Sequence, residues 1–78
     1  MEEHKILDRI TVDSKVMVGK PTIRGLRITV EQVLTALSSG IPADDLLEDY
    51  PELEADDIKA VLIYALELVK QERIFAVA

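Results

Sequence analysis

A helix-capping signal at Thr29 divides this chain into two parts that must fold differently. Thr29 and Gln32 have the spacing of a capping box, in which each side chain binds the free backbone N–H of the other residue. Apolar residues after Thr29 recur at helical spacing, whereas those before it alternate over short runs. We therefore predict an α+β, mainly helical fold. Short N-terminal strands and a hairpin precede a three-helix helix-turn-helix core.

The part before Thr29 is predicted to form strands and a hairpin over residues 9–28. Arg24-Gly25 is the expected hairpin turn, because glycine supplies the positive φ that a tight turn requires. Residues 1–8 are predicted to form a flexible tail. The predicted extended segments are Arg9–Val12, Val16–Val18, Pro21–Ile23 and Leu26–Ile28.

Three helices are predicted over residues 29–74. The first ends at Gly40, which is placed to adopt a left-handed cap, and a short second helix over 43–49 ends before Pro51. The third begins near Ala55 and is expected to continue to Arg73. Its predicted core-facing residues are Ile58, Val61, Leu62, Ala65, Leu68 and Val69.

A second apolar seam on the third helix consists of Ala60, Ile63 and Tyr64. A helix in so small a domain has one core to face, so this seam needs another partner. A homodimer, or a different protein, would supply it. The alternative is that the N-terminal strands cover that side, and the sequence leaves both interpretations open.

The charge is distributed unevenly between the two parts. Residues 1–30 contain six basic and four acidic residues, a balance of +2, whereas residues 31–78 contain three basic and eleven acidic residues, a balance of −8. The basic cluster surrounds the predicted hairpin and is a candidate phosphate or DNA contact, because a two-stranded ribbon can enter a major groove. A solvated sheet edge kept from aggregating by charge is the alternative. The cluster comprises Lys15, Lys20, Arg24 and Arg27.

The sequence contains no recognisable catalytic or metal-binding pattern. His4 is the only histidine, and there is no cysteine, so we predict neither an enzyme nor a bound cofactor or metal. The longest nearly uncharged run, residues 60–69, is about half the length of a membrane span. The 78 residues of the chain are expected to form a single domain without membrane association, and we expect a cytoplasmic protein.

A series of short motifs resembles the small bacterial and archaeal family catalogued as domain of unknown function four-three-three. The resemblance covers about residues 9–68, and its most specific part is the GKPTIRGLRI stretch. Leu26 and Ser14 depart from it, standing where the family usually has Thr and Pro. The matching positions are Arg9-Ile10, Asp13, Gly19-Lys20-Pro21, Ile23, Gly25, Arg27-Ile28, Gly40-Ile41 and Leu46 to Pro51.

What this resemblance implies is a VapB-like antitoxin with a homeodomain-like helical core, commonly encoded beside a toxin with a PIN-like ribonuclease domain. On that hypothesis the acidic helical part covers a basic nuclease surface, and the basic hairpin touches operator DNA. The competing hypothesis is a dimeric protein–protein interaction module whose helix-turn-helix is architectural and binds no DNA. The gene beside this one discriminates between them.

Overall fold

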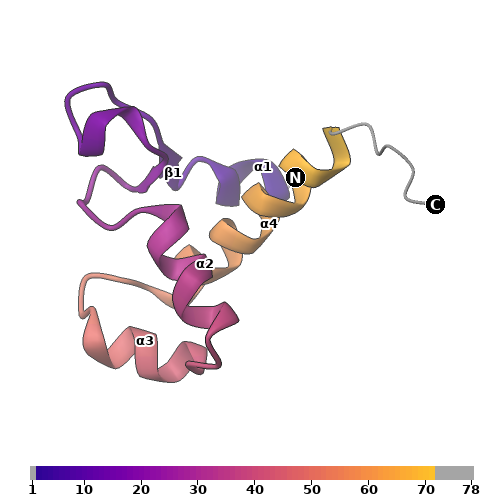
Figure 1. The fold of residues 1–78 in the computed structure, drawn as a ribbon. Helices are drawn as coiled ribbons and strands as arrows, with labels where there is room; N and C mark the ends of the chain where they lie inside the picture. The colour runs from indigo at the N-terminus through magenta and orange to yellow at the C-terminus, as the bar shows by residue number, and fades with distance from the viewer. Residues whose placement is uncertain (1, 72–78) are drawn as a thin grey trace.

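The chain forms a small bundle of helices with a short sheet at one side (Figure 1). This computed structural model describes the backbone of residues 2–71 and the side chains of residues 5–71. The α+β, mainly helical class is confirmed, with two short strands ahead of three mutually contacting helices. The elements are α1 (Glu2–Leu7), β1 (Ile10–Thr11), η1 (Met17–Gly19), β2 (Thr22–Ile23), α2 (Val30–Ser38), α3 (Ala43–Asp49) and α4 (Ala55–Gln71).

The predicted turn at Arg24-Gly25 is present. Both residues have positive φ, 49° and 74°, and the Leu26 N–H donates to the Ile23 carbonyl at 2.8 Å. After the turn, the chain returns beside β2. The Ile23 N–H donates to the Ile28 carbonyl, and Thr22 forms a single β-bridge with Thr29. The regular partner of β2 is β1, antiparallel, with Ile10 opposite Ile23. The regular sheet therefore consists of β1 and β2, and the predicted extended segment over residues 26–28 forms no strand.

Two predictions for the N-terminal part are wrong. Of the predicted extended segment 16–18 only Val16 is extended, because Met17, Val18 and Gly19 all have positive φ and form the left-handed turn η1. The chain must reverse between the paired strands β1 and β2, and this requirement overrides the β preference of valine. Residues expected to be a tail form α1, which packs against α4 and leaves Ile6 and Leu7 half-buried.

The boundaries of α2 follow from its two caps. The Gln32 N–H donates to Thr29 Oγ1 at 3.0 Å, and the Thr29 N–H donates to Gln32 Oε1 at 2.8 Å, which confirms the capping box. At the other end Gly40 has φ of 93°. The Ile41 N–H then reaches the Ala36 carbonyl and the Gly40 N–H reaches that of Leu37, the two bonds of a Schellman motif.

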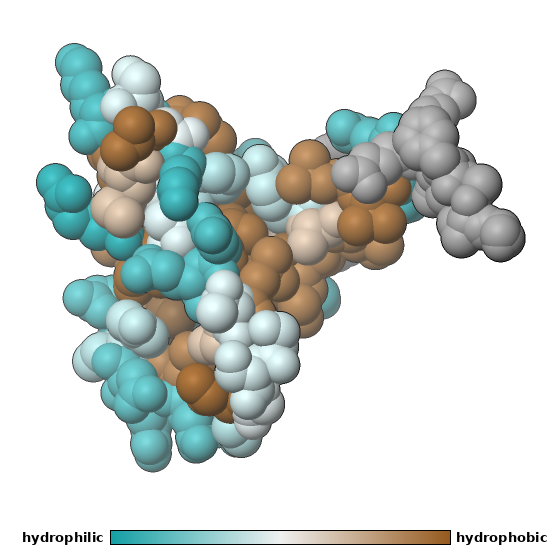
Figure 2. All heavy atoms as spheres, viewed as in Figure 1, coloured by the Kyte–Doolittle hydropathy of each residue, from teal (hydrophilic) through white to brown (hydrophobic). Residues whose placement is uncertain are grey.

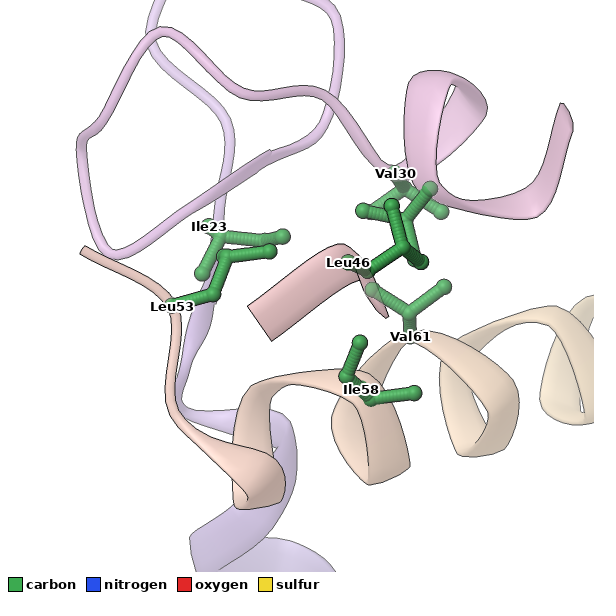
Figure 3. Close-up of a cluster of buried hydrophobic side chains, with 7 residues drawn as sticks. Ile23, Val30, Leu46, Leu53, Ile58 and Val61 are labelled. Carbon is green, nitrogen blue, oxygen red and sulfur yellow. The ribbon is translucent and has the colours of Figure 1, made fainter. Parts of the chain in front are cut away.

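The hydrophobic core lies where α2, α3 and α4 meet β2 (Figure 3). Only the first half of α4 reaches it, so Ile58 and Val61 are buried as predicted, whereas Leu62, Leu68 and Val69 are exposed. The prediction for Leu68 and Val69 is wrong because α2 and α3 are short and α4 extends past them (Figure 1). Leu62 lies next to the buried Val61 but on a face of α4 that is turned away from the core, so the prediction for Leu62 is wrong as well. Arg73, the predicted end of α4, lies outside the described residues. The buried core is formed by Ile23, Val30, Val33, Leu46, Leu53, Ile58 and Val61.

Candidate functional site

One buried carboxylate organises the charged residues of the fold. The Asp57 side chain, in the first turn of α4, has no exposed surface. Arg24 donates to it from Nε to Oδ1 at 3.0 Å and from Nη2 to Oδ2 at 2.9 Å. Arg9 Nη1 donates to Oδ1 at 2.9 Å, and the Glu54 N–H donates to Oδ2 at 2.8 Å. Through these hydrogen bonds the buried Asp57 carboxylate joins three segments of the chain, which contain Arg9, Arg24 and Glu54.

The arginines have further partners at the same place. Arg24 Nη2 donates to the Glu52 carbonyl at 2.6 Å, and Arg9 Nη1 donates to Glu54 Oε1 at 2.7 Å. Burial alone raises the pKa of Asp57, but hydrogen bonds from Arg24, from the Glu54 N–H and from Arg9 outweigh it and hold that pKa below its ordinary value of 3.8. Asp57 is therefore ionised in the folded protein at neutral pH.

Arg24, which was predicted to contact phosphate, has partners within the fold. Its guanidinium is engaged by Asp57 and by the Glu52 carbonyl, so it joins the turn after β2 to the start of α4. This engagement also explains why an arginine occupies a left-handed turn position that usually favours asparagine or aspartate. The sequence analysis did not predict that Asp57 binds arginine.

The other three predicted basic residues, Lys15, Lys20 and Arg27, do lie together. They line an open groove of about 910 Å³ whose floor is the outward face of α2. Lys20 Nζ lies 3.0 Å from Glu31 Oε1 in an ion pair exposed to solvent. Within the described residues, the Lys15 and Arg27 side chains make no ion pair. We call this hollow the basic groove.

The walls of the basic groove are apolar as well as cationic. Met17 and Val18 of η1 line it from the hairpin side, and Ile41 and Tyr50 from the side of α3. Gln32 and Thr35 contribute polar groups to the floor. Such a lining suits an anionic ligand that also carries apolar groups.

The seam predicted as a dimer or partner interface is largely covered by the chain itself. Ala60 is fully buried, and Tyr64 packs against the core. Ile63 is half-buried. The covering elements are α1 and β1, whose Leu7 and Ile10 line a small hollow with Tyr64, so the alternative that the N-terminal strands cover this side is confirmed in part. Ala60 therefore offers no interface, because the chain itself covers it completely.

A different apolar surface is exposed on α4. Leu62, Leu66 and Val69 are 50%, 52% and 59% exposed. Their i, i+4, i+7 spacing places them on one face of the helix, and we call them the α4 stripe. Figure 2 shows apolar residues gathered along the part of α4 that extends from the body. The spacing was present in the sequence, but two of the three residues were assigned to the core.

Residues 5–71 contain no group of three or more acidic or histidine side chains placed to hold a metal ion. Among the helices of residues 2–71, none combines the length and apolar character that crossing a membrane requires. The candidate functional features of the described residues are therefore two surfaces, the basic groove and the α4 stripe.

Comparison with known proteins identifies the family. The model of the family described as "Protein of unknown function (DUF433)" matches residues 10–65. The chain belongs to the DUF433 family. That match spans both strands, α2, α3 and the buried half of α4, so the Arg24–Asp57 contact lies within the family domain.

The matching relatives have no described activity. An uncharacterized protein, y4eO of Sinorhizobium fredii, is 32% identical over 56 residues, which is 72% of this chain but only 25% of that protein. An uncharacterized protein of Archaeoglobus fulgidus is 64% identical over 25 residues, 32% of this chain and 69% of the relative. No solved structure matches.

Proposed function

We propose that this DUF433 protein is a non-catalytic, antitoxin-like protein that binds and neutralises a PIN-like ribonuclease. The observation that carries the proposal is the α4 stripe, three apolar side chains about half exposed on a helix that extends beyond the core. Water contact with such a surface is unfavourable, and binding a protein partner removes it. The cytoplasm is where such a pair would meet.

The charge of the chain favours this class of partner. Its net charge is −6, and an enzyme that binds RNA needs a basic surface to neutralise phosphates. Opposite net charges accelerate association and favour correct partners. An acidic protein with an apolar helix face therefore suits a basic nuclease better than it suits a nucleic acid.

We do not extend the proposal to operator DNA. Arg24 is engaged by Asp57, and Lys15, Lys20 and Arg27 line a concave surface. Duplex sequence is read by helices or ribbons that protrude into a groove of the DNA. The alternative function is a dimeric interaction module without a toxin partner, and the absence of a nuclease gene beside this one would favour it.

The experiment measures RNA cleavage by the adjacently encoded nuclease with increasing amounts of this protein. We expect the wild type to suppress cleavage near a one-to-one ratio. The variant Leu62→Gln/Leu66→Gln/Val69→Gln should need at least about ten times more protein, because each leucine or valine contributes about 1–3 kcal/mol when buried. Val12→Gln is the matched control, since Val12 is 62% exposed and lies outside the stripe.

Two results would overturn the proposal. One is unimpaired cleavage at a large excess of wild-type protein. The other is equal suppression by the stripe variant and by the Val12→Gln control, which would mean that the nuclease is bound through another surface.

A further inference from the structure

The basic groove carries charge that the chain itself does not neutralise. In a protein of net charge −6, Lys15, Lys20 and Arg27 converge on one hollow, and within the described residues only Lys20 has an acidic partner. Like charges gathered at one surface repel one another. An anionic occupant would relieve that repulsion.

The rim of the groove has a second unusual feature. Val18 is 91% exposed and has φ of 57° and ψ of 36°. A left-handed conformation is unfavourable for an L-residue, and a branched side chain is among the least tolerant of it. Nothing in the described residues covers this side chain. A strained, exposed apolar residue on a groove rim is typical of a surface that is completed by a partner.

The lining distinguishes between classes of occupant. A nucleic-acid strand is bound by cations together with stacked aromatic rings, and among the described residues Tyr50 is the only aromatic one that lines the groove. The apolar contacts come instead from aliphatic and thioether groups of Met17, Val18 and Ile41. Such a lining fits an acidic protein segment with aliphatic side chains.

The chain itself contains a segment of that chemistry. The surface of α3 exposes Asp44, Asp45, Glu48 and Asp49, and Ile41 and Tyr50 beside it are each 38% exposed, whereas its Leu47 packs against the core of the same chain. Ile41 and Tyr50, which flank α3 in the sequence, also form one wall of the groove. The groove and α3 therefore lie next to each other, with the β1–β2 loop at one end of α2 and α3 at the other (Figure 1).

We propose that the basic groove receives the acidic face of α3 from a second copy of this chain, which forms a two-fold symmetric dimer. Two adjacent complementary patches satisfy the requirement of a two-fold interface, since each copy offers both. The α4 stripe is a separate surface and takes no part in this contact. The inference goes beyond the proposed function and does not depend on a toxin.

Charge reversal tests this pairing directly. Sedimentation equilibrium of the wild type should give twice the chain mass of 8.7 kDa, with association weakened by salt. Lys15→Glu/Arg27→Glu reverses the groove, and Asp45→Lys/Glu48→Lys reverses α3. Each variant alone should associate at least about 100-fold more weakly, because like charges then face each other. Circular dichroism checks that both are folded.

The decisive experiment is to mix the two charge-reversal variants. Both contacts of the mixed dimer are again between opposite charges, so the doubled mass should return. The variant Leu62→Gln/Leu66→Gln/Val69→Gln should remain dimeric, which separates this result from a failure to bind the nuclease. A monomeric wild type at about 100 µM, or no recovery on mixing, would overturn the proposal. Promoter DNA bound by a monomeric wild type and lost in Lys15→Glu/Arg27→Glu would overturn it in favour of nucleic acid.

Discussion

The Arg24 guanidinium forms a two-pronged contact with the Asp57 carboxylate, from Nε at 3.0 Å and from Nη2 at 2.9 Å. The two residues are 33 positions apart and join the turn after β2 to the first turn of α4. Asp57 is fully buried, so its charge must be compensated inside the protein. This contact gives Arg24, at the turn of the hairpin, a structural role.

Replacing Arg24 or Arg27 of the hairpin singly by glutamine should change the free energy of unfolding by different amounts. Arg24→Gln should lower the free energy of unfolding by about 1–3 kcal/mol, because a buried carboxylate loses its main donor. The lower part of that range is expected, since the Arg24 side chain is 34% exposed. Arg27→Gln is the matched control and should change it by less than about 0.5 kcal/mol. Urea unfolding measures both, and equal effects would contradict the structural role of Arg24.

Acid should weaken the fold through Asp57. Its pKa is below 3.8 in the folded chain, so the folded state holds its proton less tightly than the unfolded state does. The stability that follows is complete above the unfolded pKa and is lost as the pH falls through the folded one. Asp57→Asn should be less stable than wild type by about 2–3 kcal/mol near neutral pH, and the difference should shrink below about pH 4. Urea titrations of both proteins at several pH values measure this difference in stability. A difference that does not change with pH would contradict the role of the Asp57 charge.

Relaxing the strained turn should stabilise the monomer. Val18 has φ of 57°, and asparagine tolerates that region better than valine does. Val18→Asn should add about 1 kcal/mol, which for a domain of this size raises Tm by about 4–8 °C. Val12→Asn is the control, because Val12 is exposed but is not among the residues of positive φ. Calorimetry at a concentration where the chain is monomeric decides; no gain for Val18→Asn would mean that the turn is unstrained.

Elements defined by local signals could be predicted from the sequence. The capping box at Thr29, the left-handed Gly40 and the stop at Pro51 each depend on a few neighbouring residues. The turn at Arg24-Gly25 is of the same kind. For these the interaction partners lie within a few positions, so a pattern in the sequence contains them.

Long-range relationships could not be predicted in the same way. Charge counting placed Arg24 on a binding surface, because nothing near it in the sequence indicates that Asp57 lies beside it in the fold. The apolar periodicity of α4 was visible, but how far the core extends along the helix depends on the lengths of α2 and α3. The six-residue α1 is too short for periodicity to mark it, so one of the elements that pack against α4 was missed.

The most direct measurement is calorimetric titration of the adjacently encoded nuclease with single stripe variants. Leu66→Asp should weaken Kd by at least about tenfold, because it places a charge where an apolar contact is expected. Val12→Asp, with the same charge change at a comparably exposed position, should leave Kd unchanged. Equal Kd values for wild type, Leu66→Asp and Val12→Asp would contradict the claim that the α4 stripe binds the partner.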